Sequence, residues 1–131
     1  MRILAIDYGS KKIGLAISNP SGSIAFPFST INNDKLLLKT LKKIFLTERV
    51  EKIVVGLPRY NKKTPLYQEL KKFIENLYGA LMISIVTHDE LLTTQAAKKI
   101  SERNKNRHDL AAMIILQDYL ASTTPHSQTS A

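Results

Sequence analysis

Acidic residues lie at the ends of predicted strands or the starts of predicted helices, where side chains often do chemistry. Asp7 ends the first apolar run, His88-Asp89-Glu90 follows a later one, and Asp109 begins the last helix. Clustered carboxylates favour a hard cation such as Mg²⁺, which one or two carboxylates hold together with substrate phosphates. Two such ions about 3.5–4 Å apart can activate water for phosphodiester hydrolysis. These acids therefore predict a site for phosphate chemistry.

Basic residues flank the acids and would bind the backbone of a nucleic acid. Lys and Arg total 19 against 11 Asp and Glu, so the net charge is +8 and the pI is near 9.8. A basic balance of this size favours polyanionic partners, chiefly nucleic acid or ribosomal surfaces. The expected phosphate contacts are Lys11, Lys12, Arg59, Lys63, Lys98 and Lys99.

Each acid also has an ordinary structural explanation. Asp7 could form a turn at the end of its strand. Asp89 and Asp109 could cap the helices that follow them. His88 and His108 are more often turn or cap residues than ligands, and no metal-binding spacing links them. Only the combination of these groups at one edge of a sheet favours a functional site.

The elements that position these groups begin with three strands. Apolar runs predict strands over 2–7, 13–18 and 23–31, joined by tight loops into an antiparallel meander. Asn19-Pro20-Ser21-Gly22 has the proline and glycine typical of a type I turn. Pro27 cannot donate a hydrogen bond, so it assigns the third strand to an edge of the sheet.

The second half of the sequence alternates helices with strands. The predicted helices begin at Asn33 or Asp34, run from Thr64 to Gly79, and cover residues 90–103 and 109–120. Predicted strands over 52–57 and 81–87 lie between them. Strands alternating with helices require parallel pairing through right-handed crossovers. We therefore expect an α/β fold: a mixed five-stranded sheet, with three antiparallel strands followed by βαβ crossovers, covered by helices.

Length and composition define one domain. The 131 residues predict a single domain over 1–121, followed by a Ser/Thr-rich disordered tail over 122–131. The absence of cysteine excludes disulfide scaffolds and zinc-thiolate sites and fits the reducing cytosol. No apolar run reaches the roughly 18 residues of a membrane span. We therefore expect a cytoplasmic protein with no membrane partner.

Four sequence blocks occur in an order typical of one family. They cover residues 6–16, 53–58, 89–94 and 109–120. Together they resemble the YqgF family of Holliday-junction-resolvase-like proteins, also regarded as pre-16S rRNA nucleases. The resemblance implies an RNase H-like fold and a metal-dependent nuclease. It also implies that Asp7, Glu90 and Asp109 are the catalytic acids and hold Mg²⁺ or Mn²⁺.

The sequence departs from the family pattern at several positions. Lys12 and Leu91 stand where the family usually has arginine. Lys12 keeps the positive charge but cannot donate the paired hydrogen bonds of a guanidinium group. Characterised RNase H-like nucleases have a carboxylate just after the fourth strand, where this chain reads Gly56-Leu57-Pro58. The second metal carboxylate must therefore come from Glu90 or Asp89.

The resemblance implies a role in ribosome biogenesis, with 5′-end processing of pre-16S rRNA as the favoured reaction. The implied partners are structured nucleic acid, above all precursor rRNA, and ribosomal particles. Two alternatives remain open: cleavage of DNA Holliday junctions, and a non-catalytic nucleic-acid-binding module with the same fold. ATP-dependent phosphoryl transfer is disfavoured, because actin-like kinases close two such domains around the nucleotide and 131 residues provide only one.

Overall fold

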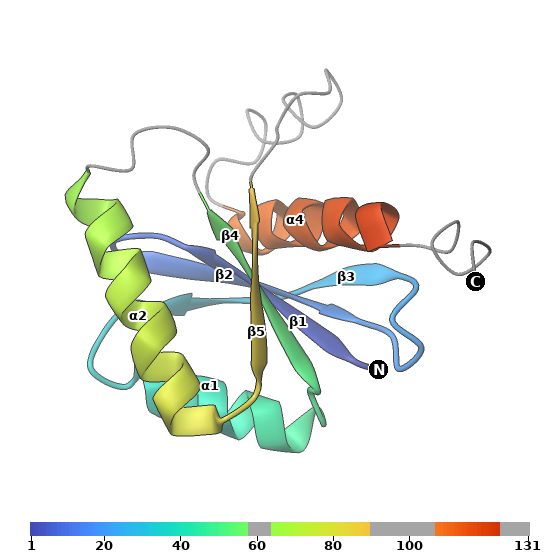
Figure 1. The fold of residues 1–131 in the computed structure, drawn as a ribbon, viewed down its shortest axis with the longest axis horizontal. Helices are drawn as coiled ribbons and strands as arrows, with labels where there is room; N and C mark the ends of the chain where they lie inside the picture. Colours follow the sequence, from blue (N-terminus) through green and yellow to red (C-terminus); the bar gives the residue numbers. More distant parts are fainter. Residues whose placement is uncertain (58–63, 90–106, 124–131) are drawn as a thin grey trace.

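A mixed five-stranded sheet forms the centre of the protein (Figure 1). The computed structural model describes residues 1–57, 64–89 and 107–123. The strands are β1 (Ile3–Tyr8), β2 (Lys12–Ser18), β3 (Ala25–Asn32), β4 (Lys52–Leu57) and β5 (Ser84–Asp89). The helices are α1 (Leu37–Thr47), α2 (Pro65–Leu81) and α4 (His108–Thr123).

The strand order is β3-β2-β1-β4-β5. The first three strands pair antiparallel, whereas β1, β4 and β5 are parallel, which confirms the predicted mixed sheet. β3 lies at an edge, as Pro27 predicted. The β2–β3 register shifts between Leu15 and Ala16, which face Ser29 and Pro27.

Side chains alternate between two cores, one on each face of the sheet. Leu4 and Ile6 of β1 belong to the core under α1 and α2. Ile3 and Ala5 belong to the core under α4. In Figure 1, α1 and α2 lie side by side, apart from α4. The α4 side chains in the second core are Ala112, Ile115, Leu116 and Leu120.

The second helix begins as predicted but ends later. The Thr64 side chain accepts a hydrogen bond from the Tyr67 N–H (3.2 Å), and a proline follows in the first turn. The prediction that Gly79 ends the helix is wrong, because α2 continues to Leu81. A helical glycine costs only about 1 kcal/mol relative to alanine, which tertiary packing can offset. Met82 ends the helix in the left-handed conformation, so β5 begins at Ser84 rather than at 81.

The start of α1 differs from the predicted cap. Its N-cap residue is Leu36, which has no capping side chain. Asp34 Oδ1 instead accepts from the Leu36 N–H (2.9 Å), and Asn33 Nδ2 donates to the Gly9 carbonyl (2.8 Å). Both predicted cap residues therefore stabilise the turn that precedes the helix, and Asn33 ties this turn to the β1–β2 loop.

The last helix extends past the predicted domain boundary at residue 121. It ends at Thr123, and the Ser122 and Thr123 hydroxyls donate to the Tyr119 carbonyl at 2.7 and 3.1 Å. The predicted helix over 90–103 and the rest of the predicted tail lie outside the described residues. No helix in the described part of the chain has the length and apolar character needed to cross a membrane.

Candidate active site

Asp7 lies at the carboxyl end of β1, the edge where ligands collect in sheets of this kind. The parallel strands β4 and β5 end at the same edge. Because Ile3 and Ala5 face α4, the alternation of the strand places Asp7 on the α4 face as well. Tyr8 lies on the opposite face, against the core under α1 and α2.

The start of α4 lies directly on the strand pair that carries Asp7. Gly14 is the antiparallel partner of Asp7, so the two residues share a face of the sheet. A Cβ atom at Gly14 would overlap the backbone carbonyl of His108 and lie 3.0 Å from the His108 Cβ. Glycine is therefore required here, and its absent side chain lets the first turn of α4 approach Asp7.

Asp109, in this first turn, forms a bidentate ion pair with Arg107. Arg107 Nε donates to Asp109 Oδ1 at 2.9 Å, and Nη2 donates to Oδ2 at 3.1 Å. The Asp109 side chain is 15% exposed, and that of Arg107 is 53% exposed. The hydrogen bonds from Arg107 lower the pKa of the Asp109 carboxyl, and partial burial opposes this only in part. Asp109 is therefore an ionised carboxylate, and its cationic partner is the Arg107 guanidinium.

Asp7 and Asp109 supply carboxylate oxygens, the donors that a divalent ion such as Mg²⁺ prefers. Asp7 lies on the face of the sheet that α4 covers, Asp109 lies in the first turn of α4, and both Asp109 oxygens accept hydrogen bonds from the Arg107 guanidinium. Mg²⁺ needs no more than one or two carboxylates together with substrate phosphates. Within residues 1–57, 64–89 and 107–123, no three His, Asp or Glu side chains gather into a metal site.

The third predicted acid, Glu90, lies outside the described residues, but its alternative can be placed. Val86 of β5 packs in the core under α4, whereas Ile85 packs on the other face. The alternation therefore puts His88 on the α4 face and Asp89 on the face opposite Asp7. This placement disfavours Asp89 as a partner of Asp7.

The basic residues are only partly placed. Lys11 and Lys12 are exposed beside the end of β1, and Lys12 Nζ donates to Asn32 Oδ1 at 2.6 Å. The remaining expected phosphate contacts, Arg59, Lys63, Lys98 and Lys99, lie outside the described residues. The sequence analysis did not predict that Arg107 pairs with Asp109. The only signal in the sequence is the position of this arginine two residues before the acid.

His88 connects the end of β5 to α4. Its Nε2 lies 2.6 Å from Asp118 Oδ2, within hydrogen-bond distance. The His88 ring also meets the Tyr119 ring edge-on, with centroids 5.8 Å apart. Lys52 Nζ donates to the Tyr119 hydroxyl at 3.2 Å. His88 is therefore a strand residue with a partner on α4, not a turn or cap residue.

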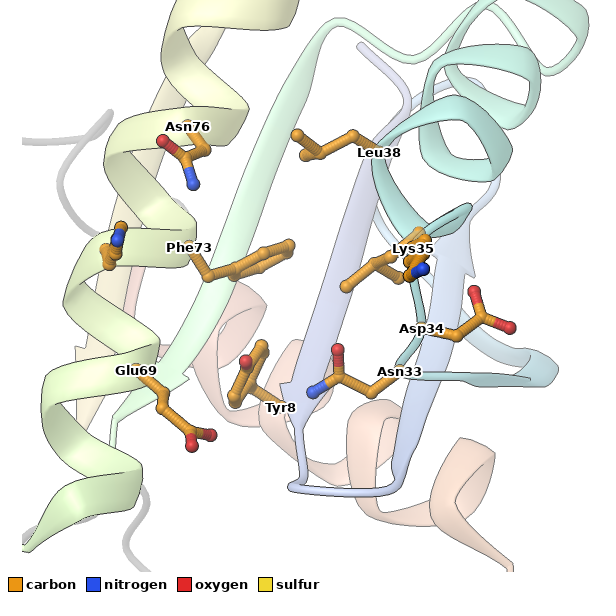
Figure 2. A pocket seen from close by; sticks show the side chains of 10 residues that line it. Tyr8, Asn33, Asp34, Lys35, Leu38, Glu69, Phe73 and Asn76 are labelled. Carbon is orange, nitrogen blue, oxygen red and sulfur yellow. The ribbon is translucent and has the colours of Figure 1, made fainter.

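A concave region lies on the face of the sheet opposite Asp7, between the first turn of α1 and α2 (Figure 2). This cavity measures about 290 Å³. Figure 2 shows Tyr8 and Phe73 at its centre, and their ring centroids are 4.9 Å apart. Its charged lining residues are Asp34, Glu69, Lys35 and Lys72. Two acids and two bases leave this cavity with no net charge to attract a polyanion.

Sequence comparisons cover nearly the whole chain. The family profile described as "RuvX: Holliday junction resolvase" matches residues 1–122. A protein of Thermoanaerobacter pseudethanolicus is 38% identical over 135 aligned positions, which cover 93% of this chain and 97% of that protein. A protein of Rickettsia peacockii is 36% identical over 132 positions, which cover 92% and 86%. Both are named "Putative pre-16S rRNA nuclease".

Solved structures share the fold at low sequence identity. RuvC of T. thermophilus, in complex with a Holliday junction substrate, matches with a TM-score of 0.66 and 12% identity, covering 93% of this chain and 94% of that one. The fowlpox virus Holliday junction resolvase matches with a TM-score of 0.57 and 13% identity, covering 93% and 99%. These likenesses confirm the predicted RNase H-like fold.

Proposed function

Because the chain belongs to the RuvX family, described as Holliday junction resolvase, we propose that it is a nuclease that processes the 5′ end of pre-16S rRNA. The names of relatives at 36–38% identity support this substrate. The observation that supports the proposal most is the close approach of the first turn of α4, which contains Asp109, to Gly14, the strand partner of Asp7. We further propose that the protein acts in the cytoplasm, on precursor rRNA or on ribosomal particles that contain it.

In this proposal Asp7, Glu90 and Asp109 are the catalytic acids and hold Mg²⁺ or Mn²⁺. A bound divalent ion would stabilise the charge that develops on the phosphodiester oxygens and lower the pKa of water. The ionised state of Asp109 supports its part, because a protonated carboxyl is a poor ligand for a hard cation. The position of Asp7 at the open end of β1 would orient the acid toward a phosphate that lies across the sheet edge.

The protein's basic side chains would bind the phosphates on either side of the cleaved bond. Lys11 and Lys12 lie where the chain turns from β1 into β2 and are exposed to solvent, which supports their assignment. The hydrogen bond from Lys12 to Asn32 would fix the direction of that ammonium group. We assign the same role to the remaining lysines and arginines of the predicted set, Arg59, Lys63, Lys98 and Lys99.

A four-way DNA junction is the second candidate substrate, favoured by the description of the family. RNA and DNA present the same phosphates to the acids, so the described residues favour neither. A third candidate is a module that binds nucleic acid without cleaving it.

One experiment separates the three. The purified protein would be incubated with Mg²⁺ or Mn²⁺ and either a 5′-labelled RNA spanning the mature 16S 5′ end or a labelled four-way junction. Asp7→Asn and Asp109→Asn serve as inactive controls that rule out contaminating nucleases. We expect cleavage of the RNA near the mature end and none in the controls. Cleavage of the junction alone would favour resolution, and binding without cleavage of either would overturn the nuclease proposal.

A further inference from the structure

Arg107 engages the carboxylate that the proposed function assigns to a divalent ion. Its guanidinium donates one hydrogen bond to each oxygen of Asp109, at 2.9 and 3.1 Å. The Leu110 N–H also donates to Asp109 Oδ1, at 3.1 Å. A cation that binds either oxygen must therefore compete with the guanidinium. The Asp109 side chain is 15% exposed and that of Arg107 is 53% exposed, so the pair lies at the edge of the site, open to solvent on the side of the guanidinium.

We propose that Arg107 exchanges partners during binding. It neutralises Asp109 before a divalent ion arrives, and it then binds a phosphate of the nucleic acid. This inference rests on the proposed function, because it takes Asp109 as a ligand of the metal.

The chemistry of the guanidinium supports the exchange. Arginine keeps its charge at every physiological pH, so a divalent ion beside Asp109 repels it instead of deprotonating it. The planar fork that fits a carboxylate also fits two phosphate oxygens. Its side chain is 53% exposed, so the group can turn without breaking a packed core. The same divalent ion that repels the guanidinium attracts a phosphate to its side.

The exchange makes the binding of metal and of nucleic acid cooperative. In the free protein the ion must displace Arg107, which weakens its affinity. A bound phosphate offers the guanidinium another partner, so the carboxylate is released at lower cost. By linkage, each ligand then raises the affinity for the other by the same factor. Removing the guanidinium should tighten metal binding in the free protein and abolish this part of the cooperativity.

The test measures Mn²⁺ binding by electron paramagnetic resonance, with and without oligouridylate as a source of phosphates, after correction for Mn²⁺ bound by the RNA alone. The variants are Arg107→Gln, which removes the charge, and Arg107→Lys, which keeps it without the fork. Arg2→Gln is the matched control, because Arg2 pairs with Glu48 at 3.5 Å elsewhere on the surface. Asp109→Asn shows whether the measured ion binds at this carboxylate.

We expect Arg107→Gln to bind Mn²⁺ about two- to fivefold more tightly than the wild type without RNA, since exposed ion pairs contribute that much. The gain in Mn²⁺ affinity on adding oligouridylate should be smaller in this variant, intermediate in Arg107→Lys, and unchanged in Arg2→Gln. Equal or weaker Mn²⁺ binding by Arg107→Gln would overturn the exchange, as would a Mn²⁺ affinity of the wild type that Asp109→Asn does not lower.

These outcomes are separate from the test of the proposed function. A wild type that cleaves RNA but shows no change in Mn²⁺ affinity on loss of Arg107 would overturn the exchange alone. A wild type that cleaves neither substrate, while Arg107→Gln still tightens Mn²⁺ binding, would overturn the nuclease proposal and leave Arg107 as a competitor of the divalent ion for the Asp109 carboxylate.

Discussion

Replacing Gly14 with alanine tests whether the contact between α4 and β2 holds the two acids together. The new Cβ would overlap the backbone carbonyl of His108 and come within 3.0 Å of the His108 Cβ. The obstacle is mainly backbone, so no change of rotamer can relieve the overlap. The start of α4 must therefore move away from the sheet and carry Asp109 with it.

The expected effect on activity is larger than the effect on stability. Clearing the overlap requires a shift of about 1 Å, and a misplacement of this size can lower a rate about 100-fold. Overpacking of this kind typically costs about 1–3 kcal/mol of folding free energy. The apolar residues of α4 beyond the first turn remain buried, so we expect the helix to stay in place. Gly14→Ala should therefore be folded but nearly inactive.

The assay compares the cleavage rate at saturating Mg²⁺ with the free energy of unfolding in urea. Gly79→Ala is the matched control, because apart from its chain neighbours and the backbone of its own helix no atom lies within 4 Å of a Cβ placed at this glycine. That variant should gain about 0.5–1 kcal/mol of stability and keep its activity. A folded Gly14→Ala protein with the wild-type cleavage rate would refute the inferred role of this contact.

Four further outcomes follow from single contacts. Asp109→Asn should abolish metal-dependent cleavage, whereas Asp89→Asn, on the opposite face, should lower the cleavage rate only mildly. A greater loss of cleavage in Asp89→Asn than in Asp109→Asn would mean that the wrong acids were assigned. The pKa of Asp109 is lowered in the folded state. Its ion pair with Arg107 therefore stabilises the protein above the unfolded-state pKa, and this stabilisation is lost as the pH falls through the folded-state pKa. The urea midpoints of wild type and Asp109→Asn should consequently converge in acid. Ser18→Ala leaves a buried backbone N–H without its 2.8 Å acceptor and should cost about 1–3 kcal/mol in urea denaturation, and a cost near zero would show that the N–H finds another partner. A double-mutant cycle of His88→Ala and Asp118→Ala should give a coupling energy of about 0.2–1 kcal/mol, whereas purely additive effects would mean that the 2.6 Å contact contributes nothing.

The strands were predictable because their apolar runs are short and are bounded by turn residues. Pro27 also identified the edge strand, since a residue without an N–H is tolerated there. The end of α2 was not predictable from local preference. Gly79 reads as a stop signal, yet Leu77 is fully buried and the helix continues to Leu81. Packing decided this boundary, and Met82 adopted the left-handed conformation that usually favours glycine.

The candidate site was predictable in its residue types but not in its contacts. The sequence places Asp7 at a strand end and Asp109 at a helix start, and the expected topology brings both to one edge. A glycine inside a strand, such as Gly14, signals a close backbone approach, but its partner depends on how a helix packs more than 90 residues later. The pairing of Arg107 with Asp109 likewise depends on side-chain rotamers, which no residue pattern determines.

The alternation along β1 has a consequence for protein engineering. Ile6 and Tyr8 face α1 and α2, whereas Asp7, between them, faces α4. The sheet thus separates the core under α1 and α2, which can be repacked for thermal stability, from Asp7 on the α4 face. Many stabilised enzymes lose activity because both properties depend on the same side chains. Here a library that varies Leu41 and Leu70 repacks one face while the acids on the other keep their surroundings.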